Sequence, residues 1–261
     1  MKFPIYQIDA FTDRLFGGNP AAVVTLESWL PDEVMQAVAA ENNLAETAFV
    51  GPGEQHPRLR WFTPAVEVDL CGHATLATAH VLFTYHYPDR GDLAFETRSG
   101  VLVVRRQRDQ LVLDFPARPG VPVEIGPDVE AALGARPVEA RLARDLLVVL
   151  ESEDLVRNLA PDLRLVAAMD VFAVIVTAAG RDVDFVSRFF APRAGIAEDP
   201  VTGSAHCTLA PYWAARLGRT RLTARQVSRR GGTLECELAG GRVLIAGRCV
   251  EYLRGVIDVP V

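Results

Sequence analysis

The chain has 261 residues, of which 49% are hydrophobic and 23% are charged, as is typical of a globular protein. Such a length allows one large domain, or two domains of about 130 residues that each bury a core. The net charge is −6 and the two signs are interspersed, which excludes a basic nucleic-acid surface and a polybasic membrane segment. We therefore expect neither nucleic acid nor membrane as a partner.

The N-terminal segment and the cysteines favour a cytoplasmic protein. Met1–Asp9 lacks the apolar core and cleavage site of a signal peptide, and no apolar stretch approaches the ~18 residues of a membrane span. The four cysteines form no CxxC pair and are expected to be free thiols. They are Cys71, Cys207, Cys236 and Cys249.

The lysine content narrows the choice of cofactor. Lys2 is the only lysine, whereas an enzyme that holds pyridoxal phosphate needs a lysine inside its site for the Schiff base. The chain also has neither a GxxxxGKS/T loop nor a GxGxxG turn after a predicted strand. We therefore expect neither pyridoxal phosphate nor a nucleotide as a cofactor.

The first half of the chain predicts a sheet with two helices. One helix begins at Pro31, with acidic residues in its first turn, and ends at Asn42. A second, apolar helix follows Gly72 and reaches Phe83. Strands are predicted at Phe3–Phe11, Ala21–Thr25, Leu44–Val50, Leu59–Thr63, Ala65–Asp69, Leu93–Thr97, Gly100–Arg106 and Gln110–Phe115. This order favours a sheet that curls around the second helix.

A linker-like stretch at 117–122 separates the halves, so we expect domains at 1–117 and 118–261. As an alternative for the last strand, near 250–261, we expect it to pack onto the first domain rather than the second. Helices are predicted at Pro127–Leu133, Ser152–Leu159 and Gly203–Leu217. Further strands are predicted at Asp145–Leu150, Val171–Thr177, Asp184–Phe190, Arg225–Ser228, Thr233–Ala239, Arg242–Val250 and Tyr252–Val256.

Two similar phrases indicate an internal duplication. Gly72-His73-Ala74 and Gly203-Ser204-Ala205 lie 131 positions apart, and each introduces an apolar helix. Upstream, Arg60–Pro64 and Arg188–Pro192 match with an offset of 128. Such spacing predicts two similar domains. Each glycine turn would also direct free backbone N–H groups and the positive end of a helix dipole toward an anion.

Glu46 is the first candidate for chemistry. Its neighbours Leu44, Ala45, Ala48 and Phe49 are apolar, so an interior strand would remove water from the carboxylate and suit it to proton exchange. The same pattern also fits a Glu46 on the solvent side of a half-exposed strand.

The two glycine turns carry the remaining candidates. His73 can move a proton near neutral pH. Asp199 precedes the Gly203 turn and is either a catalytic group or a capping residue, and Ser204 either donates to a carboxylate or caps the helix. Cys71 at a helix N-terminus suggests a thiolate, but Thr202 occupies the matching position, which disfavours a symmetric pair of cysteine bases. No ligand spacing predicts a metal site.

The sequence resembles the PhzF-like family, named for the phenazine-biosynthesis isomerase. The phrases that carry this resemblance are Asp9–Thr12, Gly18–Ala21, Asn42–Phe49, Asp69–Leu76 and Glu198–Ala205. The family implies the α+β diaminopimelate-epimerase-like fold: two pseudo-symmetric domains, each a curled, mostly antiparallel and barrel-like sheet around a central helix. It also implies a site in the cleft between the domains, a homodimer and no cofactor.

The resemblance also implies roles for individual residues. Glu46 would be the catalytic acid and base, with His73 and Asp199 as catalytic partners and Ser204 in the site. Gly72 and Gly203 would donate backbone N–H groups, and Thr202 is added to the substrate-binding set. These roles imply an isomerase that shifts a proton in a small carboxylate or amino-acid-like substrate, with dihydro-hydroxyanthranilate as one possibility. Two alternatives remain: a racemase or epimerase that uses Cys71, and a non-catalytic protein that binds small acids.

Overall fold

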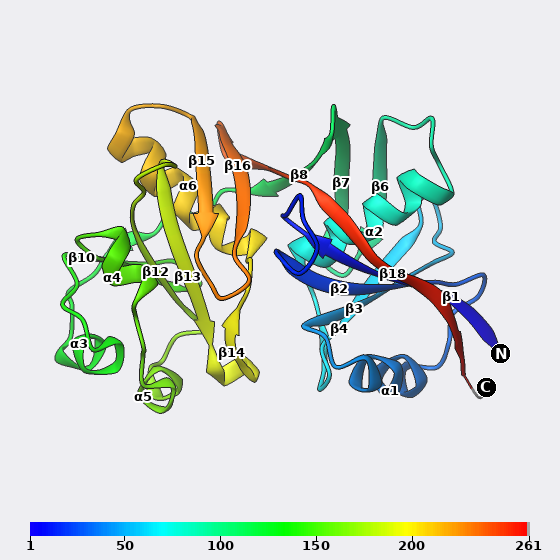
Figure 1. Cartoon of the computed structure of the whole chain (residues 1–261), viewed down its shortest axis with the longest axis horizontal. Helices are drawn as coiled ribbons and strands as arrows, with labels where there is room; N and C mark the ends of the chain where they lie inside the picture. The colour runs from blue at the N-terminus through cyan, green and yellow to red at the C-terminus, as the bar shows by residue number, and fades with distance from the viewer. Residues whose placement is uncertain (260–261) are drawn as a thin grey trace. The chain divides into compact units, whose positions relative to one another are not determined.

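The computed structural model describes residues 1–259, which form two compact units (Figure 1). Unit 1 comprises Met1–Asp114 and the chain from Ala246 onward, and unit 2 comprises Phe115–Ile245. Unit 1 is therefore discontinuous, and unit 2 is a single insertion in it. The domain boundary expected after residue 117 lies near the first crossing between the units. Residues 260–261 of the expected final strand lie outside the described part of the chain.

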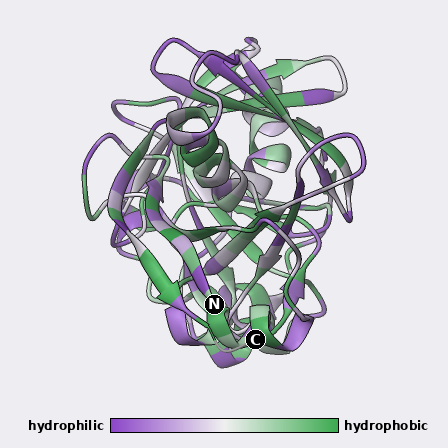
Figure 2. Cartoon of the chain, turned by 90° about the vertical axis from the view of Figure 1, so that its right-hand side faces the viewer, coloured by the Kyte–Doolittle hydropathy of each residue, from purple (hydrophilic) through white to green (hydrophobic). Residues whose placement is uncertain are grey.

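Unit 1 contains helices α1 and α2 among mainly antiparallel strands. Strand β1 pairs antiparallel with both β2 and β18, and Figures 1 and 2 show the two chain ends close together. The elements are β1 (Lys2–Ala10), β2 (Asn19–Thr25), α1 (Asp32–Asn42), β3 (Glu46–Gly51), β4 (Arg58–Phe62), β5 (Glu67–Val68), α2 (Gly72–Tyr85), β6 (Asp92–Thr97), β7 (Gly100–Gln107), β8 (Gln110–Pro116, which crosses into unit 2) and β18 (Cys249–Asp258).

Unit 2 contains α6 as its longest helix. Its elements are β9 (Val121–Pro122), α3 (Pro127–Leu133), β10 (Glu139–Leu142), β11 (Leu146–Val149), α4 (Glu153–Arg157), α5 (Leu163–Ala168), β12 (Val174–Ala179), β13 (Phe185–Ala191), the 3₁₀ turn η1 (Pro192–Ala194), β14 (Ile196–Asp199), α6 (Gly203–Leu217), β15 (Arg221–Gln226), β16 (Gly232–Ala239) and β17 (Arg242–Gly247, which crosses into unit 1).

The strand pairing of unit 1 recurs in unit 2. In unit 1, β2 runs parallel to β3, β3 antiparallel to β4, and β4 antiparallel to β5 and parallel to β6. In unit 2, β11 runs parallel to β12, β12 antiparallel to β13, and β13 antiparallel to β14 and parallel to β15. Helices α2 and α6 occupy equivalent places, after β5 and after β14. The α+β class and the duplicated topology are confirmed, but the mixed sheet is not closed into a barrel.

Helix α2 is buried on nearly every side, which explains its composition. Its buried positions are mostly glycine, alanine, threonine and leucine, so strands can pack closely around it. The buried hydroxyls of Thr75 and Thr78 donate to the carbonyls of Cys71 (2.5 Å) and Ala74 (2.7 Å), so neither lacks a partner.

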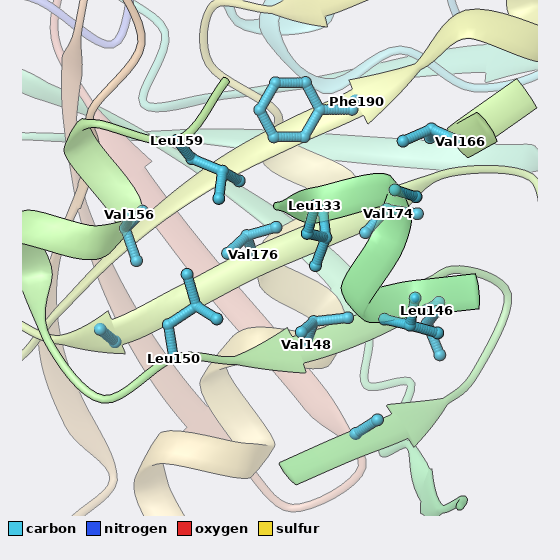
Figure 3. Close-up of a cluster of buried hydrophobic side chains, with 14 of the residues drawn as sticks. Leu133, Leu146, Val148, Leu150, Val156, Leu159, Val166, Val174, Val176 and Phe190 are labelled. Carbon is cyan, nitrogen blue, oxygen red and sulfur yellow. The ribbon is translucent and has the colours of Figure 1, made fainter. Parts of the chain in front are cut away.

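Each unit has an apolar core beside its sheet. In unit 1, Met35 of α1 packs with Phe49 of β3 and Phe62 of β4. In unit 2, Leu133 of α3 and Phe190 of β13 lie over the valines of β11 and β12 (Figure 3).

Some predicted elements differ from the structure. Strand β15 spans Arg221–Gln226 rather than 225–228, because Leu222, Ala224 and Gln226 are its buried positions and it pairs parallel with β13. Strand β10 was not predicted, since it is short and carries charged residues within its pattern. Within residues 1–259, no helix has the length and apolarity needed to cross a membrane.

Candidate active site

Three predicted side chains meet at the N-terminus of α2 in unit 1. Glu46 begins β3, Cys71 is the N-cap of α2, and His73 lies in the first turn of that helix. His73 Nε2 is 3.1 Å from Glu46 Oε2, and Cys71 Sγ is 3.5 Å from His73 Nδ1. All three residues are buried, so Glu46 is interior and the solvent-facing alternative is wrong.

The Glu46–His73 contact is close but not aligned as a hydrogen bond. Glu46 Oε2 and His73 Nε2 are both buried, and neither has a hydrogen-bond partner among the described residues. Buried polar groups are normally satisfied, so two such atoms side by side indicate a site prepared for a ligand.

Asn19 of β2 contacts the other nitrogen of the His73 imidazole, Nδ1. Its side-chain amide lies 3.1 Å from His73 Nδ1. The amide nitrogen can donate to a neutral Nδ1, and the flipped amide oxygen can accept from a protonated one. Burial opposes the charged ring, yet the negative charge of the adjacent Glu46 carboxylate raises the pKa of His73 above its usual 6.5. The ring is therefore equipped to hold a proton beside Glu46 at neutral pH.

Cys71 is a poor thiolate despite its place at a helix N-terminus. Burial, followed by the charge of Glu46, raises the pKa of its thiol to about 11. One ligand atom from each of Glu46, Cys71 and His73 also lies within 4.8 Å of the others, as in a metal site. However, the imidazole stands between the other two and presents a different nitrogen to each, which does not suit a tetrahedral metal centre.

A second polar group precedes α6 in unit 2. The hydroxyl of Thr202 donates to Asp199 Oδ2, and both residues are buried. Gln226 of β15 donates to the carbonyl of Asp199 (2.7 Å) and to Thr202 Oγ1 (3.1 Å), and its oxygen accepts from the Thr202 N–H (2.8 Å). Both donors of Thr202 are therefore engaged, so its clearest role in the structure is to orient Asp199.

His206 stabilises the first turn of α6 in its neutral form. It is fully buried, and its Nδ1 lies 2.8 Å from the carbonyl of Thr202, which requires the ring to donate there. Burial lowers the pKa of His206 to about 4. On the same turn, Arg144 Nη2 lies 3.4 Å from Ser204 Oγ and donates to it.

Matching arginine–glutamate clamps hold the segments that lead to the two helices. Arg60 of β4 makes a bidentate contact with Glu67 of β5 (2.7 Å for both bonds), and Arg188 of β13 makes one with Glu198 of β14 (2.7 and 2.9 Å). Each guanidinium also lies over the aromatic ring two residues further along its own strand, at 5.1 and 4.9 Å. The duplication thus includes the devices that position both glycine turns.

Sequence reasoning missed two members of these groups, Asn19 and Gln226. Asn19 lies in the phrase Gly18–Ala21, which contributed to the family resemblance without suggesting a contact with His73. Gln226 is a polar residue at a fully buried strand position, a signal that depends on the strand being placed correctly. The site roles predicted for Gly72, Gly203 and Ser204 stay predictions.

Comparison with known proteins gives the family. The family model described as "Phenazine biosynthesis-like protein" matches residues 8–255. An uncharacterized isomerase of Pseudomonas aeruginosa is 54% identical, with 98% of this chain and 99% of the relative covered. A crystal structure of a PhzF-family phenazine biosynthesis protein from Enterococcus faecalis is 50% identical, with a TM-score of 0.97, and the match covers 99% of this chain and 100% of that one.

A more distant structure shows the same fold. A hydroxyproline epimerase from Agrobacterium vitis, 12% identical, superposes with a TM-score of 0.62 over 98% of this chain and 92% of its own. The epimerase-like fold is therefore confirmed, and so at a general level is the prediction of an isomerase. The chain belongs to the phenazine biosynthesis-like protein family.

Proposed function

We propose that this protein is a cofactor-independent isomerase that moves a proton within a small carboxylate-bearing substrate, with Glu46 as the acid and base. The observation that carries the proposal is the pair of buried atoms Glu46 Oε2 and His73 Nε2, 3.1 Å apart and without aligned hydrogen bonds. Poised acid–base groups of this kind cluster at catalytic sites.

The proton shift has two steps. Glu46 Oε2 takes a proton from a substrate carbon, so the C–H bond breaks and its electrons enter the adjacent unsaturated system. The new Glu46 O–H then delivers the proton to another carbon on the same face, and the double bond moves. Backbone N–H groups at the start of α2 are suited to stabilise charge on the substrate carboxylate. His73, whose Nε2 lies 3.1 Å from Glu46 Oε2, is the catalytic partner of Glu46.

Unit 2 contributes to the proposal through its own glycine turn. Asp199 is assigned as a catalytic group, and Thr202, Gly203 and Ser204 as substrate-binding residues. The hydrogen bond from the Thr202 hydroxyl to the buried Asp199 carboxylate supports this assignment, and Gln226 holds both Thr202 Oγ1 and the main-chain carbonyl of Asp199. A cytoplasmic location and a homodimer remain part of the proposal.

The racemase alternative depends on Cys71. It is less well supported, because the raised pKa of the buried thiol keeps it neutral near pH 7. A binding protein without catalysis is also less well supported, since a buried and unsatisfied acid–base pair destabilises a fold that does not use it.

Proton NMR in D₂O tests the proposal with a panel of dihydro-hydroxyanthranilate, diaminopimelate, proline and hydroxyproline. Deuterium entry with double-bond migration supports the isomerase, and Glu46→Gln should lower its rate by ~10²–10⁴. Glu41→Gln, at an exposed position of α1, is the matched control and should keep full activity. Exchange only at an α-carbon would favour the racemase, and full activity in Glu46→Gln would refute the role of Glu46.

A further inference from the structure

Unit 2 has a cavity that none of the roles above uses. It has a volume of about 470 Å³ and lies between the β10–β11 turn, the segment after α5, and η1. Its wall includes two arginines, Arg144 and Arg193, and the half-exposed ring of Phe172. We call it the Arg144–Arg193 pocket.

Arg144 is held rigidly in this wall. Its Nε and Nη2 donate to the buried carboxylate of Asp145 at 2.9 and 2.8 Å, and its guanidinium lies 4.7 Å from the centre of the Phe172 ring. Within residues 1–259, its Nη1 has no hydrogen-bond partner. Because Nη2 also reaches Ser204 Oγ, Arg144 connects the pocket to the first turn of α6.

Arg193 keeps more of its donors free. Its Nη1 donates to the carbonyl of Met169 at 2.9 Å and lies 3.4 Å from Asp170 Oδ1. Asp170 is fully exposed, so this ion pair is weak. In the described part of the chain, Nε and Nη2 of Arg193 have no partner, and this edge of a guanidinium binds a carboxylate in a bidentate manner.

We propose that the Arg144–Arg193 pocket binds a planar carboxylate, with the carboxylate on Arg193 and the unsaturated or aromatic part against Phe172. The contact between Arg144 and Ser204 makes it a specificity pocket of the proposed isomerase. The inference rests on that proposed function: the pocket lies beside Ser204, which is assigned to substrate binding, and it selects substrates with a second carboxylate. Asp170 is a built-in competitor, because it occupies one edge of Arg193 with a negative charge.

Binding is tested directly with phthalate, benzoate and neutral benzamide, followed through the arginine Nε–H signals in ¹H–¹⁵N NMR. Phthalate and benzoate should shift the Arg193 signal, and benzamide should not. Arg193→Gln should weaken phthalate binding about tenfold, the effect of losing a charge-assisted pair. Asp170→Asn should strengthen it, because the competing charge is removed. Equal affinity for benzamide, or unchanged binding in Arg193→Gln, would overturn the proposal.

A control variant and a kinetic measurement test whether the effect is specific to Arg193 and to the proposed isomerase. Arg221→Gln is the matched control, since Arg221 is an exposed arginine paired with one carboxylate, Glu237, away from the pocket. With any substrate that shows deuterium exchange, Arg193→Gln should raise KM and leave kcat nearly unchanged. An unchanged KM in Arg193→Gln would overturn the proposed role of the pocket and leave the proposed isomerase standing. Carboxylate binding without exchange on any substrate overturns the proposed isomerase and leaves the pocket as a binding site.

Discussion

Neutral His206 makes the protein sensitive to acid, and the size of the effect follows from its surroundings. The folded chain binds a proton at His206 only near pH 4, whereas an unfolded histidine does so near 6.5. Above pH 6.5 both states are neutral, so stability is unaffected there. As the pH falls from 6.5 to 4, the unfolded chain alone gains the proton, and the free energy of unfolding drops by about 1.4 kcal/mol per pH unit. The accumulated loss is about 3 kcal/mol, and it stops growing below pH 4.

Urea unfolding at pH values from about 4 to 7.5 measures this loss by comparison with His206→Asn. The asparagine amide can replace Nδ1–H as donor to the Thr202 carbonyl and does not titrate. Subtracting the two profiles removes the contribution of carboxylates, so the difference should slope only between pH 6.5 and 4. His86→Asn, at an exposed position, should keep the wild-type profile. Parallel profiles for wild type and His206→Asn would refute the reasoning.

Three further substitutions test the site. Cys71→Ser should keep turnover within a few-fold, because a thiol with a pKa of about 11 is not the base; a loss above ~100-fold in the exchange assay would instead support the racemase. Arg60→Met should lower the free energy of unfolding in urea by about 1–2 kcal/mol, because Glu67 loses its bidentate partner but keeps Arg98 Nη2 at 2.6 Å. An unchanged midpoint would show that the clamp is dispensable. Gln226→Leu removes three buried hydrogen bonds and should lower the free energy of unfolding by about 3 kcal/mol. The rate of deuterium exchange should fall by more than the loss of folded protein explains. A rate proportional to the folded fraction would contradict the role of Gln226 in orienting Asp199.

Local sequence signals predicted the two glycine turns and the helices that follow them, but not the side-chain contacts that Asn19 and Gln226 make beside these turns. The two glycine turns and their apolar helices are encoded by neighbouring residues, so α2 and α6 could be predicted. The meeting of Asn19 with His73 joins positions far apart in the chain and depends on the packing of β2 against α2. No periodicity carries that information.

Gln226 illustrates a related limit. Its role depends on the register of β15, which is set by parallel pairing with β13 rather than by the local pattern of Arg225–Ser228. Glu46 was ambiguous for the same reason: apolar neighbours fit either face of a strand, and only the packing of β3 against α2 decides between them.

The insertion of unit 2 into unit 1 has a consequence for synthesis. Strand β18 pairs with β1 along a ladder that runs from Lys2↔Asp258 to Ala10↔Cys249, so the first strand made waits for the last. Unit 2 is contiguous and can fold before β18 has been synthesised. Until β18 emerges from the ribosome, β1 exposes an open edge on which another nascent chain can pair. The half of the protein that is translated first is therefore the half that finishes folding second.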